Sequence, residues 1–356
     1  WLEDEALLNI LPADVMPKAS DHIAQMIEIT ARLLEKGLAY EVGGTVYFDV
    51  SAFPAYGRLS GQKVDETHAG HRVEVESDKR DPADFALWKR AGPERLMKWP
   101  SPWGDGFPGW HIECSAMSLK HLGDRFDIHT GGIDLKFPHH EDEIAQSEGA
   151  LGHAVVSVWM HGEFLTLDDT KMAKSAGNII RVADLPDKGY EPLAFRYLAL
   201  TAHYRSKLDF TGDAMHAAAS GLRRLRRAAS PAAPGVDLTA QPMASYRARF
   251  VEAIADDLAT PRALALAHEV ASAADLDDTQ RASLLGDFDR VLGLSLDRPA
   301  ASDAPLPAGA DELLERRAAA RASRDYGAAD ALRDELAELG VIVRDTATGQ
   351  ETSRWE

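Results

Sequence analysis

The 356-residue chain contains one cysteine, Cys114, and this scarcity limits what can hold the protein together. A single cysteine cannot form a disulfide within the chain, and a protein without disulfides fits a reducing compartment, so we expect a cytoplasmic protein. No apolar run reaches the roughly 18 residues of a membrane-spanning helix. No signal-peptide pattern stands at the amino terminus. We therefore expect no membrane partner.

An excess of basic charge is also lacking. The chain has 39 lysines and arginines against 57 acidic residues, a formal net charge of −18. Such a surface disfavours non-specific binding of nucleic acid, although it is compatible with one local basic face. The candidate face is GLRRLRRAA, with Arg223, Arg224, Arg226 and Arg227. The same pattern fits the solvated outer face of a helix equally well.

The length and the 45% of hydrophobic residues are enough for two or three domains with real cores. Most side chains able to do chemistry lie between residues 109 and 178. This stretch contains GWHIECSAMS, then DIHTGGIDLKFPHHEDEIAQSEGA, then WMHGEFLTLDDTKMAKSAGN.

The PHHEDE cluster has the spacing of a metal site. Pro138 suits the first turn of a helix, and His139 and Glu143 then share one helical face. With the Cys114 thiolate they would offer sulfur, nitrogen and oxygen, a set that suits zinc with one position left open. The alternative is structural: a lone cysteine is often a small buried hydrophobe, and HHEDE could be a solvated helix start.

The second cluster, LDDTKMAKSAGN, is rich in turn-forming residues, so Lys171 and Lys174 are expected on a loop. Two lysines beside small residues can bind the oxygens of a polyphosphate and stabilise charge as phosphate departs. Taken alone, the pattern is also that of an ordinary solvated loop.

Together these motifs, in this order, resemble the cysteinyl-tRNA synthetases, a family of class I aminoacyl-tRNA synthetases. The resemblance extends over effectively the whole chain. It includes VYFDVSAFPAYGRLSGQ at 46–62, DFALWK at 84–89, WPSPWG at 99–104 and DYGAADALRDELAELGVIVRDTATG at 325–349.

The resemblance implies a function and specific roles. The family activates L-cysteine with ATP to cysteinyl-adenylate and transfers it to tRNA(Cys). Cys114, His139 and Glu143 match three of the family's four zinc ligands, one zinc per chain. Trp110 and His129 match positions around the substrate cysteine. Lys174 matches the signature-loop lysine that contacts ATP, which enters with magnesium, and Lys171 is expected to act beside it. We expect a monomer.

Three departures from the family pattern accompany these matches. The fourth zinc ligand, a cysteine, and the HIGH signature that binds ATP are expected upstream of Trp1, and no HxGH pattern occurs in the chain. Residues 1–356 alone are therefore expected to be inactive, with half of the ATP site missing. In the signature loop, Ala173 replaces the usual serine.

The fold implied is α/β: a Rossmann-like parallel sheet of the class I nucleotide-binding type, incomplete at its amino terminus, then a helical bundle and a small α/β module. His129 is expected at a strand end, where such a sheet exposes its ligand groups. We assign five segments: the end of the first catalytic half at 1–37, a connective insertion at 38–105, the second catalytic half at 106–211, an anticodon-side bundle at 212–299 and an anticodon-binding module at 300–356.

Local patterns predict the elements within these segments. Ser20 and Asp21 are expected to cap a helix that stops at Gly37. Thr260 is expected to cap a later helix, with Pro261 in its first turn. Trp88, Trp99 and Trp103 are expected to pack in the insertion rather than bind ligand. Helices are expected at 138–150, 191–204, 213–229, 244–257, 260–274, 279–294, 311–323 and 328–340, and strands at 45–50, 124–132, 156–162 and 341–346, the last followed by a polar tail.

Two competing interpretations stand beside the tRNA ligase. One is the mycothiol-pathway ligase that joins cysteine to an amino sugar on the same core, and residues 212–356 favour a tRNA enzyme over that shorter relative. The other is a truncated paralogue that binds metal or tRNA without activating cysteine. The retention of every downstream motif favours an ordinary enzyme.

Overall fold

The computed structural model describes residues 1–62, 78–167, 170–171, 180–229, 236–298, 306–339, 341–346 and 349–354. The chain forms two compact units. One is Ala13–Phe164, and the other joins Trp1–Pro12 to Leu165–Glu356. Among the described residues, no helix is both long and apolar enough to cross a membrane.

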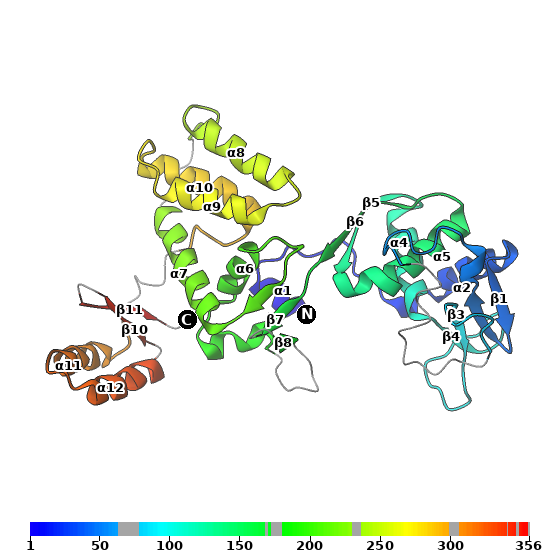
Figure 1. Cartoon of the computed structure of the whole chain (residues 1–356), viewed down its shortest axis with the longest axis horizontal. Coiled ribbons are helices and arrows are strands. Elements are labelled where there is room, and N and C mark those ends of the chain that lie inside the picture. Colours follow the sequence, from blue (N-terminus) through cyan, green and yellow to red (C-terminus); the bar gives the residue numbers. More distant parts are fainter. Residues whose placement is uncertain are drawn as a thin grey trace. The chain divides into compact units, whose positions relative to one another are not determined.

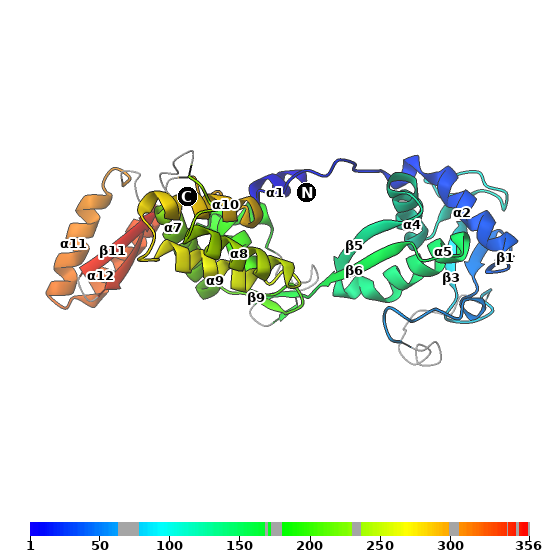
Figure 2. The same ribbon diagram turned by 90° about the horizontal axis from the view of Figure 1, so that it is seen from above.

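The unit Ala13–Phe164 packs three helices against one another beside an antiparallel sheet, and it also carries a parallel pair of strands (Figures 1 and 2). Its elements are α2 (Ile23–Glu35), β1 (Ala39–Val42), β2 (Thr45–Phe48), β3 (Phe85–Arg90), β4 (Gly106–Pro108), α4 (Trp110–Leu122), β5 (Phe126–Gly132), α5 (Glu141–Leu151) and β6 (Val156–Gly162).

Helix α2 forms because its apolar residues recur with helical spacing. Met26 and Leu33 are fully buried, and Ile23 and Ile27 pack against the same core. The predicted caps are wrong. Ser20 and Asp21 lie in a separate short turn, Ala19–Asp21, and His22 takes the position before the helix.

The antiparallel sheet has the order β1-β2-β3-β4. Trp88 on β3 is fully buried, and Trp99 and Trp103 pack against the same core. Their predicted packing role is confirmed. The aromatic faces of Phe48 and Phe85 stack at a centroid distance of 5.0 Å, so this sheet is held by large apolar side chains.

Strands β5 and β6 pair in parallel, with α5 as the crossover between them. The prediction of a strand–helix–strand unit is confirmed. The sheet that β5 and β6 form has only these two strands among the described residues, so the predicted Rossmann-like sheet is not seen in full. The expected position of His129 is wrong: it lies inside β5, opposite Trp159 of β6, rather than at the strand end.

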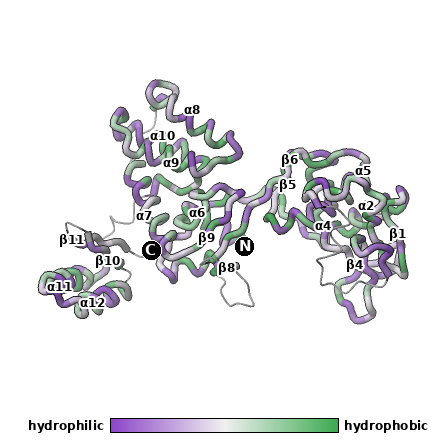
Figure 3. The backbone as a smooth tube through the Cα atoms, in the orientation of Figure 1, coloured by the Kyte–Doolittle hydropathy of each residue, from purple (hydrophilic) through white to green (hydrophobic). Residues whose placement is uncertain are grey.

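The second unit is mainly helical. In Figure 3, hydrophilic and hydrophobic stretches alternate along its helices, as expected for helices with one buried face. The described elements are α1 (Leu2–Leu7), β7 (Leu165–Leu167), β8 (Thr170–Lys171), α6 (Pro192–Leu200), β9 (Leu208–Phe210), α7 (Gly212–Ala229), α8 (Met243–Ala255), α9 (Thr260–Ala271), α10 (Asp278–Leu292), α11 (Ala310–Ala322), α12 (Tyr326–Glu338), β10 (Val341–Thr346) and β11 (Gly349–Arg354).

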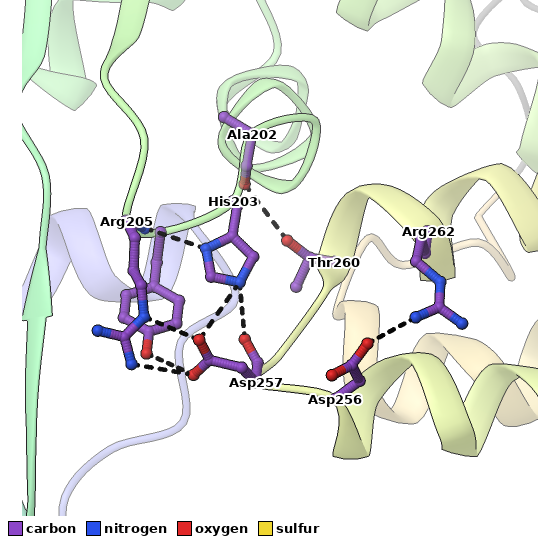
Figure 4. Close-up of polar contacts among 8 residues, drawn as sticks. Ala202, His203, Arg205, Asp256, Asp257, Thr260 and Arg262 are labelled. Carbon is purple, nitrogen blue, oxygen red and sulfur yellow. Dashed lines mark hydrogen bonds and ion pairs between the residues drawn. The ribbon is translucent and has the colours of Figure 1, made fainter.

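The connection between α8 and α9 is held by one carboxylate (Figure 4). Asp257 accepts hydrogen bonds from the Tyr204 hydroxyl at 2.6 Å and from Arg205 Nε at 2.8 Å, and these bonds lower its pKa to about 2. The predicted cap of α9 is wrong. Thr260 is the first residue of the helix, Ala259 precedes it, and the Thr260 hydroxyl donates instead to the Ala202 carbonyl at 3.4 Å.

At the carboxyl end, α11 and α12 pack together beside the antiparallel hairpin β10–β11. The predicted strand at 341–346 is confirmed, but the expected polar tail is wrong because 349–354 forms the second strand. Arg317 of α11 is 1% exposed and donates to both carboxylate oxygens of Asp345 at 3.0 and 2.9 Å. A buried charge that is paired in this way joins the helices to the hairpin.

The arginine cluster on α7 is divided between core and surface. Arg226 is buried and donates to both carboxylate oxygens of Glu191 at 2.7 and 2.6 Å, and to the carbonyls of Leu294 and Ser295 at 3.0 and 3.1 Å. The prediction that Arg226 belongs to a nucleic-acid-binding face is therefore wrong, because its guanidinium is buried and hydrogen-bonded inside the unit. Arg224 and Arg227 are exposed.

Replacing Arg226 with alanine should lower the free energy of unfolding by about 3 kcal/mol, because Glu191 and two carbonyls lose a buried charged donor. Arg224→Ala, on the exposed side of the same helix, should stay within about 0.5 kcal/mol of wild type. Chemical denaturation of the three proteins measures both effects. Equal stability of the two variants would show that the Arg226 pair is not structural.

Candidate metal and amino-acid site

The three predicted metal ligands lie together at the start of two helices. Cys114 is on α4, Glu143 is in the first turn of α5, and His139 is in the irregular turn just before α5. Their ligand atoms all lie within 4.8 Å of one another. His139 Nε2 is 3.0 Å from Glu143 Oε1. The fold thus brings sulfur, nitrogen and oxygen from residues 114, 139 and 143 into one candidate metal site.

The local backbone explains how His139 and Glu143 meet. The sequence predicted Pro138 in the first turn of α5, and this is wrong. Pro138 lies in the irregular turn ahead of the helix, and the residue before it, Phe137, is extended at φ −141° and ψ 133°. That conformation is the one favoured ahead of proline. The regular helix starts at Glu141. His139, although it precedes the helix, still contacts Glu143 four residues later, as it would on one helical face.

The first turn of α5 is not a solvated helix start. Glu141, Asp142 and Glu143 are 0%, 1% and 3% exposed. Glu141 accepts hydrogen bonds from the backbone N–H groups of Leu59 and Ser60 at 3.2 and 2.8 Å. Three consecutive buried carboxylic side chains need partners or a cation, because burying an unpaired charge is costly.

Two features of this cluster fit a cation. Among the described residues, no group donates a hydrogen bond of normal geometry to the buried Glu143 Oε1, although His139 Nε2 lies 3.0 Å from it. Burial, Glu143 and Glu113 raise the pKa of the Cys114 thiol to about 12, so without a cation the thiol stays protonated. A divalent ion at this position would satisfy the oxygen and ionise the thiol. The donor set is the one that zinc takes in proteins.

The two predicted pocket residues lie beside the same cluster. Trp110 is the first residue of α4 and is 59% exposed, and its ring lies 4.4 Å from the His139 ring. His129 Nε2 is 3.6 Å from Glu143 Oε1, and its ring stacks on Trp159 at 4.7 Å. Burial lowers the pKa of His129. An aromatic ring and an imidazole therefore flank the candidate ligands.

Two histidines of the site, His140 and His161, were not singled out in the sequence. His129, His140 and Glu143 form a second group whose ligand atoms lie within 4.8 Å, and His140 Nδ1 is 2.9 Å from His161 Nε2. Burial first, then neighbouring histidines, lower the pKa of His140 to about 3. A β-carbon on Gly131 would lie 2.7 Å from His140 Cε1, so a glycine is needed there.

His111 was also missed, although it stands three residues before Cys114 and so on the same side of α4. Its Nδ1 is 2.9 Å from His139 Nδ1, and its Nε2 is 3.2 Å from Asp142 Oδ2. Burial first, then His139, lowers the pKa of His111 to about 3, so the ring is neutral at physiological pH. The helical spacing from Cys114 was the signal that could have found it.

The predicted ATP-contacting loop lies mostly outside the described residues. The backbone of Lys171 belongs to β8 and pairs with Thr166 of β7. Lys174 lies outside the described residues. The roles of both lysines stay predictions.

Comparisons with known proteins give consistent matches. A family model described as the catalytic domain of class I (C) tRNA synthetases matches residues 1–220, and one described as the cysteinyl-tRNA ligase anticodon binding domain matches residues 303–352. The cysteine–tRNA ligase of Thermus thermophilus is 46% identical to this chain over an alignment of 371 residues. The alignment covers 98% of this chain and 76% of that protein. The cysteine–tRNA ligase of Alkalilimnicola ehrlichii is 47% identical, with 98% and 78% covered.

Among solved structures, the methionyl-tRNA synthetase of Mycobacterium tuberculosis in complex with methionyl-adenylate matches with a TM-score of 0.51 at 16% sequence identity. The match covers 92% of this chain and 81% of that one. At this level of identity the similarity concerns the fold alone, and it agrees with an α/β catalytic region followed by helices.

The raised pKa of Cys114 predicts slow alkylation of the metal-free protein. At pH 8 iodoacetamide should modify Cys114 much more slowly than free cysteine, because only the thiolate reacts. Glu143→Gln removes a nearby negative charge, so it should lower the pKa and speed the reaction. Mass spectrometry across a pH series measures the rate at the single cysteine of the chain. An alkylation midpoint near pH 8.5 in the metal-free wild type would contradict this electrostatic picture.

Proposed function

The chain belongs to the cysteinyl-tRNA synthetase family of ATP-dependent class I ligases, and on that premise we propose that Cys114, His139 and Glu143 hold a zinc ion that selects cysteine. The observation that carries this proposal is the meeting of the three ligand atoms within 4.8 Å. Three protein ligands from a thiol, an imidazole and a carboxylate leave a fourth position for a further ligand. The reaction is the formation of cysteinyl-adenylate and its transfer to tRNA(Cys).

Selection of cysteine over serine is the chemical problem that this cluster addresses. The two amino acids differ by one atom, and a pocket that measures size alone would separate them by only about 1–3 kcal/mol. When bound, zinc supplies a borderline-soft site that takes an ionised sulfur in preference to a neutral hydroxyl. We therefore propose that the enzyme needs no separate editing step against serine.

The chain's own residues then bind and orient the substrate. The Trp110 ring, in contact with His139, would cover the amino acid, and the neutral His129 beside Glu143 would line the pocket. The cysteine carboxylate attacks the ATP α-phosphate, forming the adenylate and releasing pyrophosphate. Lys171 and Lys174 are proposed to stabilise the departing charge, with magnesium accompanying ATP. The activated cysteine then passes to the terminal ribose of the tRNA.

The predicted segments take their roles from the same premise. We propose that 1–37 and 106–211 belong to the two halves of a Rossmann-like catalytic fold, with the insertion at 38–105 between them. The bundle at 212–299 would lie on the anticodon side of the tRNA, and the module at 300–356 would contact the anticodon. The match of residues 303–352 to an anticodon-binding model supports the last assignment and favours a tRNA ligase over an amino-sugar ligase. A monomer stays our prediction.

ATP–pyrophosphate exchange tests the proposed zinc role. It is measured on this chain and on a version extended to the length of its relatives, with cysteine and with serine. In the zinc-loaded extended protein, the exchange rate with cysteine should exceed the rate with serine by more than about a thousandfold. Removing the metal should abolish the exchange that depends on cysteine. Undiminished exchange after complete metal removal would show that the cluster does not select the substrate.

Lys174→Ala should slow exchange by on the order of a hundredfold or more, because it removes a charge that acts on the departing phosphates. Zinc content, measured by atomic absorption, should stay at one per chain. Lys207→Ala, a lysine of the same unit outside the signature loop, serves as the control and should exchange normally. Loss of zinc together with activity in Lys174→Ala would instead make the lysine structural.

A further inference from the structure

A short strap of the insertion crosses the start of α5. The strap, residues 53–62, follows β2, and its contacts converge on the acidic first turns of the helix. The Tyr56 hydroxyl donates to Asp142 Oδ1 at 2.5 Å, and the backbone N–H of Ser60 donates to Glu141. Arg58 pairs with Glu148, about two turns further along the helix. The strap therefore supplies donors to the helix that carries a candidate metal ligand.

From Asp142 a continuous line of polar contacts runs to the candidate metal site. The other oxygen of Asp142, Oδ2, lies 3.2 Å from His111 Nε2. His111 Nδ1 lies 2.9 Å from His139 Nδ1, and His139 Nε2 lies 3.0 Å from Glu143 Oε1. Each link is within contact range, and Asp142 and His139 are 1% and 4% exposed. Water is thus largely excluded along the path.

The chemistry of the groups determines where each hydrogen must lie if His139 binds a metal. Its Nε2 lies 3.0 Å from Glu143 Oε1, whereas its Nδ1 is in contact with His111, so Nε2 is the ligand atom and carries no proton. The proton of His139 is then on Nδ1 and is donated to His111 Nδ1. His111 in turn carries its proton on Nε2 and donates it to Asp142. Asp142 accepts two hydrogen bonds, one from His111 and one from Tyr56.

We propose that Tyr56 is a positioning residue for the metal site: its hydroxyl, through Asp142 and His111, holds the His139 imidazole in the orientation and tautomer that bind zinc. This inference rests on the proposed zinc role. It gives the insertion a part in amino-acid selection, although the strap itself is not among the ligands. The polar partners behind a ligating histidine commonly change metal affinity by about 10- to 100-fold when they are removed.

The structure offers a matched control in the same unit. Tyr40 donates its hydroxyl to the buried Asp84 Oδ2 at 2.6 Å, so it forms the same kind of tyrosine–carboxylate pair. The other bonds of Asp84 go to the backbone N–H groups of Val50 and Asp81. Tyr40→Phe therefore removes an equivalent hydrogen bond within the sheet region, together with the acceptor of the Arg80 backbone N–H, while Tyr56→Phe removes one on the path to His139.

The experiment measures zinc affinity by competition with a chromogenic chelator, using the extended protein in its zinc-loaded form. Tyr56→Phe should bind zinc about tenfold more weakly than wild type, and its KM for cysteine should rise more than its kcat falls. Tyr40→Phe should match wild type in zinc affinity and in KM. Thermal unfolding of the metal-free proteins reports the loss of stability in each variant.

A second variant keeps the test decisive if Tyr56→Phe folds poorly. Asp142→Asn has nearly the same shape, but its amide N–H₂ can face His111 Nε2 and force the opposite tautomer through to His139. It should weaken zinc binding more than Tyr56→Phe does. Zinc affinity equal to wild type in either folded variant would overturn the positioning role, as would an equal weakening by Tyr40→Phe. A wild-type protein that binds no zinc would instead contradict the proposed function itself.

Discussion

The burial of three consecutive carboxylic side chains at the start of α5 is the constraint on which the rest of the site depends. Such groups are stable inside a protein only when hydrogen-bond donors or a cation surround them. Each of the three carboxylic side chains has different polar partners here. Glu141 takes backbone N–H groups of the strap, Asp142 takes Tyr56 and His111, and Glu143 faces His139, His129 and the Cys114 thiol. Only the last arrangement leaves an oxygen without a donor among the described residues.

The same rule explains how the second unit uses its basic residues. Arg226 and Arg317 are both buried, and each is paired in a forked geometry with one carboxylate, Glu191 or Asp345. An arginine pattern in a sequence therefore does not by itself indicate contact with nucleic acid. In this acidic protein of net charge −18, two of the arginines join helices to neighbouring segments from inside the unit, whereas Arg224 is exposed at the surface of α7.

The local elements were predictable where one periodic signal dominates. The apolar stripe of α2 and the helices from α7 to α10 follow from spacing alone, because a 3.6-residue period buries one face of a helix. Helix α5 follows no such period, since all of Glu141–Ala150 is buried. Capping positions were not predictable, since Ser20, Asp21 and Thr260 compete with neighbouring turns for the same backbone groups. The strand at 349–354 was missed because its residues are polar, and it forms by pairing with β10.

The sequence by itself determined the family and the residues with chemical potential: Cys114, His139, Glu143, Trp110 and His129 could all be named from motifs, because their types and spacing are tied to a reaction. Lys171 and Lys174 were named in the same way, and their roles rest on that resemblance. Only the tertiary structure decided that the acids after His139 are buried rather than solvated, and that His111, Asp142 and Tyr56 stand behind the metal ligand. The physical reason is that those contacts join residues 56, 111 and 142, which lie far apart along the chain. No local period indicates such contacts, and only the packing of the strap and of α4 against α5 brings the groups within hydrogen-bonding distance.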